Sequence, residues 1–365
     1  MSRRRVYLHI GAPKTGTTYL QDRLDLNSKA LAKHEVHYPR RSPLVSPGLF
    51  HFRAALDLLG QDWGGEPGHG HGNWDALVRR IKRRSGTVIV SHEILAPAQP
   101  VHVSRVMADL ADSEIHIVYS ARDLGRALPA AWQESIKQGR QWTFGKFLRR
   151  CRAGRSWFLR AFDIPTVLGT WGADLTPDRL HVVTVPQRPS LVHGENPLWL
   201  RFCEAFDIDP SWAPEDSHRT NPSLGVAETQ LIRQLNRRLD RRTRREATYD
   251  ALIREMLAEN ELVRSTSPRV RLPPDAFDWV EQSSERSLDY LRESGVNVVG
   301  DLDDLRPVRP NADEPWHDPD RVSARKRLKV AVDALAAMTE EAASRRDPDQ
   351  QFVRRLRTNA QRLRR

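Results

Sequence analysis

One short segment constrains this chain more than any other: the turn that joins an apolar strand to a helix near its start. The β-branched run Val6–Ile10 leads directly into Gly11-Ala12-Pro13-Lys14-Thr15-Gly16-Thr17-Thr18. At such a turn, backbone N–H groups and the positive end of the helix bind phosphate-like anions. Gly11 and Gly16 allow the backbone to wrap closely around the anion. The segment therefore predicts an anion cradle that carries one cation, Lys14.

The cradle shares its glycine spacing with the nucleotide-triphosphate loop and differs from it in the position of the lysine. Gly11 and Gly16 match the two glycines of the nucleotide-triphosphate motif G-x-x-x-x-G-K-[ST]. That motif needs a lysine directly after the second glycine, where this chain has Thr17, and its lysine lies inside the loop at Lys14. A nucleotide-dependent phosphotransferase would need that lysine, so the loop fits this class of enzyme poorly and keeps it only as an alternative.

Apolar runs elsewhere in the chain predict the fold class. Short strand-like segments alternate with helix-compatible ones, which indicates α/β architecture with a mostly parallel central sheet covered on both faces. We expect a P-loop-like three-layer fold with a C-terminal helical extension. The expected strands are residues 6–10, 87–91, 115–120, 180–185 and 296–299, and the expected helices are 16–32, 126–138, 198–206, 225–239, 321–344 and 351–364. The Gly-rich stretch 64–73 predicts a mobile loop.

Charge divides the chain unevenly. The net charge is +11, and residues 321–365 hold 13 Lys or Arg against 5 Asp or Glu, which is +8 of it. A Pro- and Asp-rich stretch precedes this region and predicts a linker. The expected division is a main domain at 1–305, a linker at 306–320 and a basic helical extension at 321–365.

Composition excludes several classes of protein. No run approaches the ~18 apolar residues of a membrane span, and the start of the chain lacks the apolar stretch of a signal peptide. The two cysteines, Cys151 and Cys203, have no CxxC spacing, so neither a disulfide framework nor a zinc site is expected. These features favour a cytoplasmic protein.

The cradle resembles the signature loop of sulfotransferases that use 3′-phosphoadenosine 5′-phosphosulfate (PAPS). The resemblance implies PAPS as co-substrate, no metal, and a Lys14 that contacts the sulfuryl group and acts as a catalytic residue. It further implies that the 5′-phosphosulfate is bound by the loop residues Gly11, Lys14, Thr15, Gly16, Thr17 and Thr18. The resemblance covers roughly residues 5–305.

The same family has a second signature, an Arg at a strand end followed by a Ser eight residues later, both on the 3′-phosphate. Arg122 follows the strand 115–120 and matches, while Ala130 stands where the Ser is expected. Ser120, Gln133 or Lys137 could replace that hydroxyl. A salt bridge to the neighbouring Asp123 is the alternative role for Arg122.

Two further observations concern the branch of the family. The G-x-x-G-x-W-K stretch of cytosolic members is not found, so the chain looks closer to the bacterial and Golgi-type branch. The segment Arg219–Gly225 precedes a helix and could face the 3′-phosphate, although an ordinary helix cap is the simpler interpretation.

Sulfuryl transfer to an alcohol also needs a proton acceptor. His92 and Glu93 follow the strand 87–91, at the edge where sites form in open α/β sheets. The resemblance implies a catalytic His in this segment, or an acidic residue in other branches of the family, and His92 and Glu93 match these by position. His92 has the better matched ordinary pKa of ~6.5. Glu35 and His37 form a weaker second pair.

The remaining signals have plainer explanations. His69 and His71 suit a solvated loop better than a metal site, because no third ligand lies at a usable spacing. Core packing is expected for Trp132, Trp142, Trp157 and Trp171, and the run Arg237–Arg245 is expected to be a solvated face.

The expected partner is a small-molecule, carbohydrate or lipid acceptor with a hydroxyl or amine, without a specific nucleic acid. A non-catalytic protein that binds anions or nucleic acid through its basic tail is the alternative from another class. The sequence leaves the acceptor and the oligomeric state open.

Overall fold

The computed structural model describes residues 4–63, 67–188, 190–192, 194–217, 219, 223–245, 249–264, 267–311 and 313–344. Its centre is a six-stranded, all-parallel sheet in the order β2-β3-β1-β4-β5-β6. The strands are β1 (Arg5–Gly11), β2 (Val36–His37), β3 (Thr87–Ser91), β4 (Glu114–Ala121), β5 (Leu180–Thr184) and β6 (Asn297–Val299).

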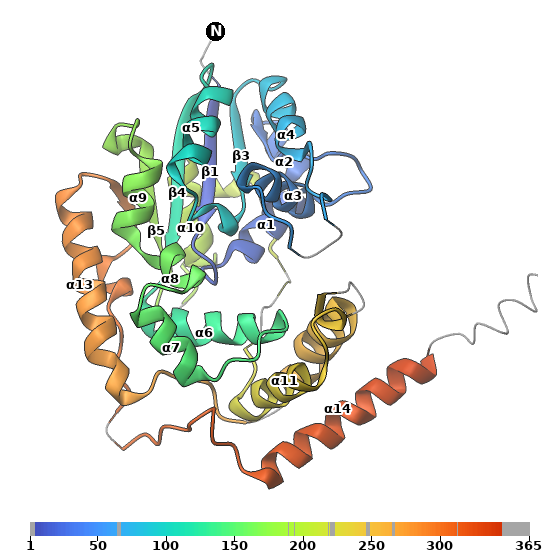
Figure 1. The fold of residues 1–365 in the computed structure, drawn as a ribbon. Coiled ribbons are helices and arrows are strands. Elements are labelled where there is room, and N and C mark those ends of the chain that lie inside the picture. Colours follow the sequence, from blue (N-terminus) through green and yellow to red (C-terminus); the bar gives the residue numbers. More distant parts are fainter. Residues whose placement is uncertain are drawn as a thin grey trace, which may run out of the picture.

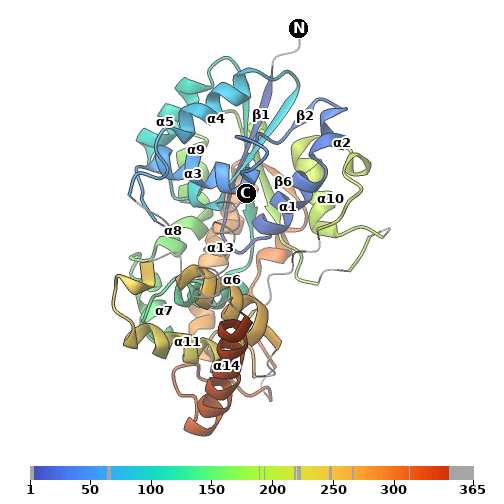
Figure 2. The same ribbon diagram turned by 90° about the vertical axis from the view of Figure 1, so that its right-hand side faces the viewer.

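Helices cover both faces of this sheet, which confirms the predicted three-layer α/β fold (Figures 1 and 2). One face carries α1 (Thr17–Leu26), α2 (Ser28–Ala32) and α10 (Pro197–Phe206). The other face carries α3 (Pro47–Leu59), α4 (Asn73–Lys82), α5 (Pro100–Asp109) and α9 (Ile164–Trp171).

Strand side chains alternate between these two layers, as the period of a strand requires. Val6, Leu8 and Ile10 of β1 pack into the core cluster under α3 and α4. Tyr7, between them, packs on the opposite side in the cluster that contains Phe202 and Phe206 of α10. A strand buried on both faces therefore reads as a continuous apolar run in the sequence.

A group of helices lies beyond the carboxyl edge of the sheet (Figure 1). It comprises α6 (Leu124–Lys137), α7 (Phe144–Arg152), α8 (Trp157–Phe162), α11 (Val226–Arg238), α14 (Ala324–Ser344) and the π-helical segment η5 (Asp250–Glu261). The long helix α13 (Phe277–Glu293) packs against both α6 and α9. These helices lie on the side of the sheet at which the 11–16 loop follows β1.

The C-terminal part of the described chain stays in contact with the main body. Gln187 bonds the main chain at Arg306, and Gln230 bonds the Pro319 carbonyl. Helix α14 packs against α11 and η5, with Val330 and Ala334 buried in the contact. The division at 305 and 320 remains a prediction, and the expected helix at 351–364 lies outside the described residues. Within the described chain, no helix is long and apolar enough to span a bilayer.

Candidate active site

Three strand ends meet at one place on the carboxyl edge. β1 lies between β3 and β4, and the chain that leaves β1 returns on the β3 side before it crosses to β4. A crevice at such a switch point is the usual ligand site of an open α/β sheet. The residues that follow these strands are the predicted ones: the 11–16 loop, the pair His92 and Glu93, and Arg122.

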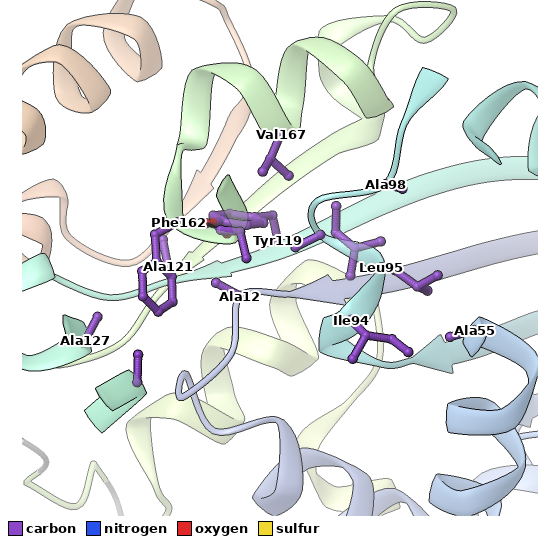
Figure 3. Close-up of a cluster of buried hydrophobic side chains, with 14 of the residues drawn as sticks. Ala12, Ala55, Ile94, Leu95, Ala98, Tyr119, Ala121, Ala127, Phe162 and Val167 are labelled. Atoms are coloured by element: carbon purple, nitrogen blue, oxygen red, sulfur yellow. Dashed lines mark hydrogen bonds between the residues drawn. The ribbon is translucent and has the colours of Figure 1, made fainter. Parts of the chain in front are cut away.

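Both glycines of the loop are required by its geometry. Gly11 has φ 103°, and a Cβ there would lie 2.8 Å from the Cα of Glu93. Gly16 has φ 94° and is the N-cap of α1, where a Cβ would lie 2.5 Å from Leu198 Cδ2. Figure 3 shows Ala12 among the buried side chains of Tyr119, Ala121 and Ile94. The loop therefore starts in the core and passes directly under Glu93.

A buried polar network fixes the underside of the loop. The His9 imidazole joins Ser91 Oγ on β3 (2.8 Å) to Ser120 Oγ on β4 (3.0 Å). Burial lowers the pKa of His9 to about 3, so the ring is neutral. Thr15 Oγ1 donates to the Ala12 carbonyl and contacts the Ser120 hydroxyl. The side chains of Thr15 and Ser120 thus hold the loop, and any contact of Thr15 with an anion would come from its backbone N–H.

Lys14 has an anionic partner within the protein. Its Nζ lies 2.6 Å from Glu134 Oε2 on α6. The second oxygen of Glu134 accepts from Gln138 Nε2 (3.2 Å) and lies 3.3 Å from Arg254 on η5. Although burial alone would raise it, these cations lower the pKa of Glu134 to about 2. In this structure the cation of the loop is therefore held by a carboxylate of α6.

Arg122 lies beside the loop, partly buried, and is paired with no carboxylate of the described chain. Its Nη1 donates to the Lys14 carbonyl at 3.2 Å, while its Nε is buried without a partner in the described structure. Burial lowers the pKa of this guanidinium to about 10, which leaves it charged at neutral pH. The alternative of a bridge to Asp123 does not occur, because Asp123 pairs with Arg126.

A second buried donor without a partner adjoins the same loop. Thr17 Oγ1, in the first turn of α1, also lacks a hydrogen-bond partner in the described structure. Buried polar atoms in folded proteins are nearly always hydrogen-bonded. Thr17 Oγ1 and Arg122 Nε are two of seven such atoms in the described structure, and both residues adjoin the 11–16 loop, where acceptor oxygens of a ligand could satisfy them.

The candidates for the missing serine hydroxyl differ in what they already bind. Ser120 is engaged by His9, and Gln133 Nε2 donates to the Leu224 carbonyl (2.5 Å) and to Thr229 Oγ1 (3.0 Å). Lys137 lies 3.6 Å from Glu259, and burial together with nearby Lys14 lowers its pKa. In the segment 219–225, Arg219 pairs with Asp22, and residues 220–222 lie outside the described chain.

His92 and Glu93 have different surroundings. The His92 ring stacks on Phe52 with centroids 5.0 Å apart, and burial lowers its pKa. The Ile94 N–H donates to His92 Nδ1 at 3.3 Å, so the proton of the neutral ring is on Nε2. Glu93 is partly exposed, and its carboxylate lies 4.0 Å from His92 Nδ1. Of the two, Glu93 presents the available proton acceptor.

The second pair of predicted residues lies elsewhere. Val36 and His37 align with Thr87 and Val88, at the amino-terminal ends of the strands. Glu35 precedes them and accepts a bond from Ser85 at the same edge. Glu35 and His37 are therefore separated from the loop by the length of the sheet.

Two of the four tryptophans singled out in the sequence lie in the core. Trp132 and Trp171 are fully buried, Trp142 lies under the guanidinium groups of Arg140 and Arg150, and Trp157 contacts Trp63. No group of three His, Cys, Asp or Glu side chains in the described chain could hold a metal ion. The residues that sequence reasoning missed are Glu134 and Arg254, which no motif marks.

Comparison of the chain with protein-family models, with curated proteins and with solved structures gives no match. The functional argument therefore depends on the geometry of the site.

Proposed function

We propose that this protein is a sulfotransferase that moves the sulfuryl group of PAPS directly to a hydroxyl or amine of an acceptor. The observation that carries the proposal is the pair of buried donors without a partner, Thr17 Oγ1 and Arg122 Nε, beside a glycine-bounded loop. Lys14 adds a positive charge to the same loop.

The residues present fit the two anionic ends of PAPS. The loop amides, Thr17 and the amino-terminal end of α1 suit the 5′-phosphosulfate, and the guanidinium of Arg122 suits the 3′-phosphate by charge-assisted hydrogen bonds. Bound PAPS would supply an activated sulfuryl group. Only Lys14 has to move, because its ammonium must exchange the carboxylate of Glu134 for an oxygen of the donor.

The proton-transfer role belongs to Glu93 in this proposal. In the transfer step the acceptor oxygen forms a bond to sulfur, the bond from sulfur to the 5′-phosphate oxygen breaks, and the acceptor proton passes to the Glu93 carboxylate. His92 Nε2–H can donate to the acceptor and fix its position. Lys14 stabilises the charge that develops on the departing oxygen.

The experiment is transfer of labelled sulfuryl from PAPS to a library of hydroxyl-bearing acceptors. Wild-type protein should label at least one acceptor class, and Lys14→Ala should lower the rate about 10²–10³-fold, the usual effect of removing one charge-stabilising donor. Lys14→Arg should not restore the rate, because the planar guanidinium group of arginine does not take the place of the compact ammonium group of lysine. Lys33→Ala, an exposed lysine on the surface, is the matched control. Equal rates for wild type and Lys14→Ala would contradict the proposal.

A further inference from the structure

Helix α14 has apolar side chains on two opposite faces, and the rest of the described chain covers one of them. Val330 and Ala334 are buried against the body. On the other face, Leu328, Val332 and Leu335 are 66%, 57% and 66% exposed. Their spacing of four and three residues places them on one helical stripe. A stripe of three large, exposed apolar side chains is the kind of surface that marks a protein–protein contact.

The charges of α14 run against its own dipole. The exposed basic residues Arg325 and Lys329 lie in its first turns, and the exposed acidic residues Asp333 and Glu340 follow them. Helices are stabilised by acidic residues at the amino-terminal end and basic residues at the carboxyl-terminal end, so this order is unfavourable in an isolated helix. A second, antiparallel copy of α14 would offset this unfavourable order. The acidic carboxyl-terminal half of each copy would then lie beside the basic amino-terminal half of the other.

We infer that α14 mediates an antiparallel homodimer. With a two-fold axis between residues 331 and 332, Leu328 of one copy meets Leu335 of the other, and the two Val332 side chains meet near the axis. Arg325 then lies within a turn of Glu340 of the second copy. Such a self-complementary contact is the usual form of a two-fold interface.

The position and length of the helix agree with this arrangement. Figures 1 and 2 place α14 at the periphery, far from the amino-terminal ends of the strands. Its 21 residues span about 30 Å, so a contact made through this helix alone is small. The dimer should therefore be weak and depend on protein concentration.

Sedimentation equilibrium of the full chain over a range of concentrations tests the apolar stripe. The wild type should pass from monomer to dimer, and Val332→Asp should remain monomeric at every concentration. Val101→Asp, which alters a valine on α5 that is 67% exposed, should dimerise like the wild type. A wild type that is monomeric throughout, or a Val332→Asp variant that dimerises normally, would overturn the inference.

A charge exchange tests the antiparallel arrangement. Arg325 and Glu340 are about 22 Å apart within one helix, so they can pair only between copies. Arg325→Glu and Glu340→Arg should each weaken the dimer, and the double variant should regain wild-type affinity. Unchanged helix content by circular dichroism would show that each variant is folded. A double variant as weak as the two single ones would exclude the antiparallel pairing.

Discussion

Lys14 and Glu134 form an ion pair that the proposed reaction has to open. The pair is close and largely buried, and Arg254 holds the other oxygen of the carboxylate. An anion at the loop therefore competes with Glu134 for the ammonium of Lys14. When Lys14 turns to the anion, Glu134 retains Arg254 and Gln138 as partners.

This competition predicts the effect of Glu134→Gln. The variant keeps the shape of the side chain and removes the charge that competes for Lys14. We expect adenosine 3′,5′-bisphosphate to bind several-fold more tightly, as measured by titration calorimetry. Glu35→Gln, at the opposite edge of the sheet, should leave the affinity unchanged. Equal or weaker binding by Glu134→Gln would show that Lys14 does not meet the bound nucleotide.

Glu93 and His92 give a second prediction at this scale. Once an acceptor is known, Glu93→Gln should lower the turnover about 10²–10⁴-fold, the range for loss of a general base. His92→Gln should have a smaller effect, because Nδ1 already accepts the Ile94 N–H. Neither change should alter the affinity for adenosine 3′,5′-bisphosphate. A larger loss for His92→Gln would assign the base to His92.

Strand ends explain which site residues could be found from the sequence. Lys14, His92, Glu93 and Arg122 each follow an apolar strand, so the carboxyl-edge rule brings them together. Glu134 is 120 positions from Lys14 and lies in mid-helix, where its spacing says nothing of the loop. The proton position on His92 also depends on a backbone contact that no spacing reveals.

At the scale of elements, the turn between β1 and α1 gives a prediction about stability. Gly11→Ala would place a methyl group 2.8 Å from the Glu93 backbone and also force a side chain into φ 103°. Gly60→Ala, at φ 60° with no atom within 4 Å, adds the backbone strain alone. We expect Gly11→Ala to lower the unfolding free energy well beyond the roughly 1 kcal/mol of Gly60→Ala, as measured by urea denaturation. Similar losses would mean that the loop can move away from Glu93.

Elements with continuous apolar patterns were predictable, and interrupted ones were not. The five expected strands occur as β1, β3, β4, β5 and β6, whereas β2 has two residues and leaves no pattern. The helix expected at 16–32 divides at Asn27, whose buried side chain bonds the main chain of Glu215. A long-range contact of this kind overrides local helix propensity.

At the scale of the whole molecule, buried neutral histidines determine the response to acid. Burial lowers the pKa of His9 and of His51 to about 3 and that of His181 to about 4. In the unfolded chain these groups take up protons near their ordinary pKa of about 6.5. The unfolded state therefore binds more protons below that pH, and the stability present above pH 6.5 is lost as the pH falls.

The prediction is a decline of stability between about pH 6.5 and pH 4, with each histidine contributing up to about 1.4 kcal/mol per pH unit. Urea midpoints measured across this range should fall steadily. His51→Gln should reduce the slope, because His51 Nδ1 can accept the Ser91 N–H only while the ring is neutral. Urea midpoints that stay constant down to pH 4 would show that these rings take up protons as readily in the folded protein as in the unfolded chain.

The most direct test of the central claim is binding of adenosine 3′,5′-bisphosphate by calorimetry, since it requires no knowledge of the acceptor. Wild-type protein should bind this nucleotide without added metal and should bind adenosine 5′-monophosphate much more weakly. Arg122→Ala should remove most of that preference, because a charge-assisted hydrogen bond contributes about 1.5–3 kcal/mol. Absence of binding to the bisphosphate, or tighter binding of ATP with magnesium, would contradict the account.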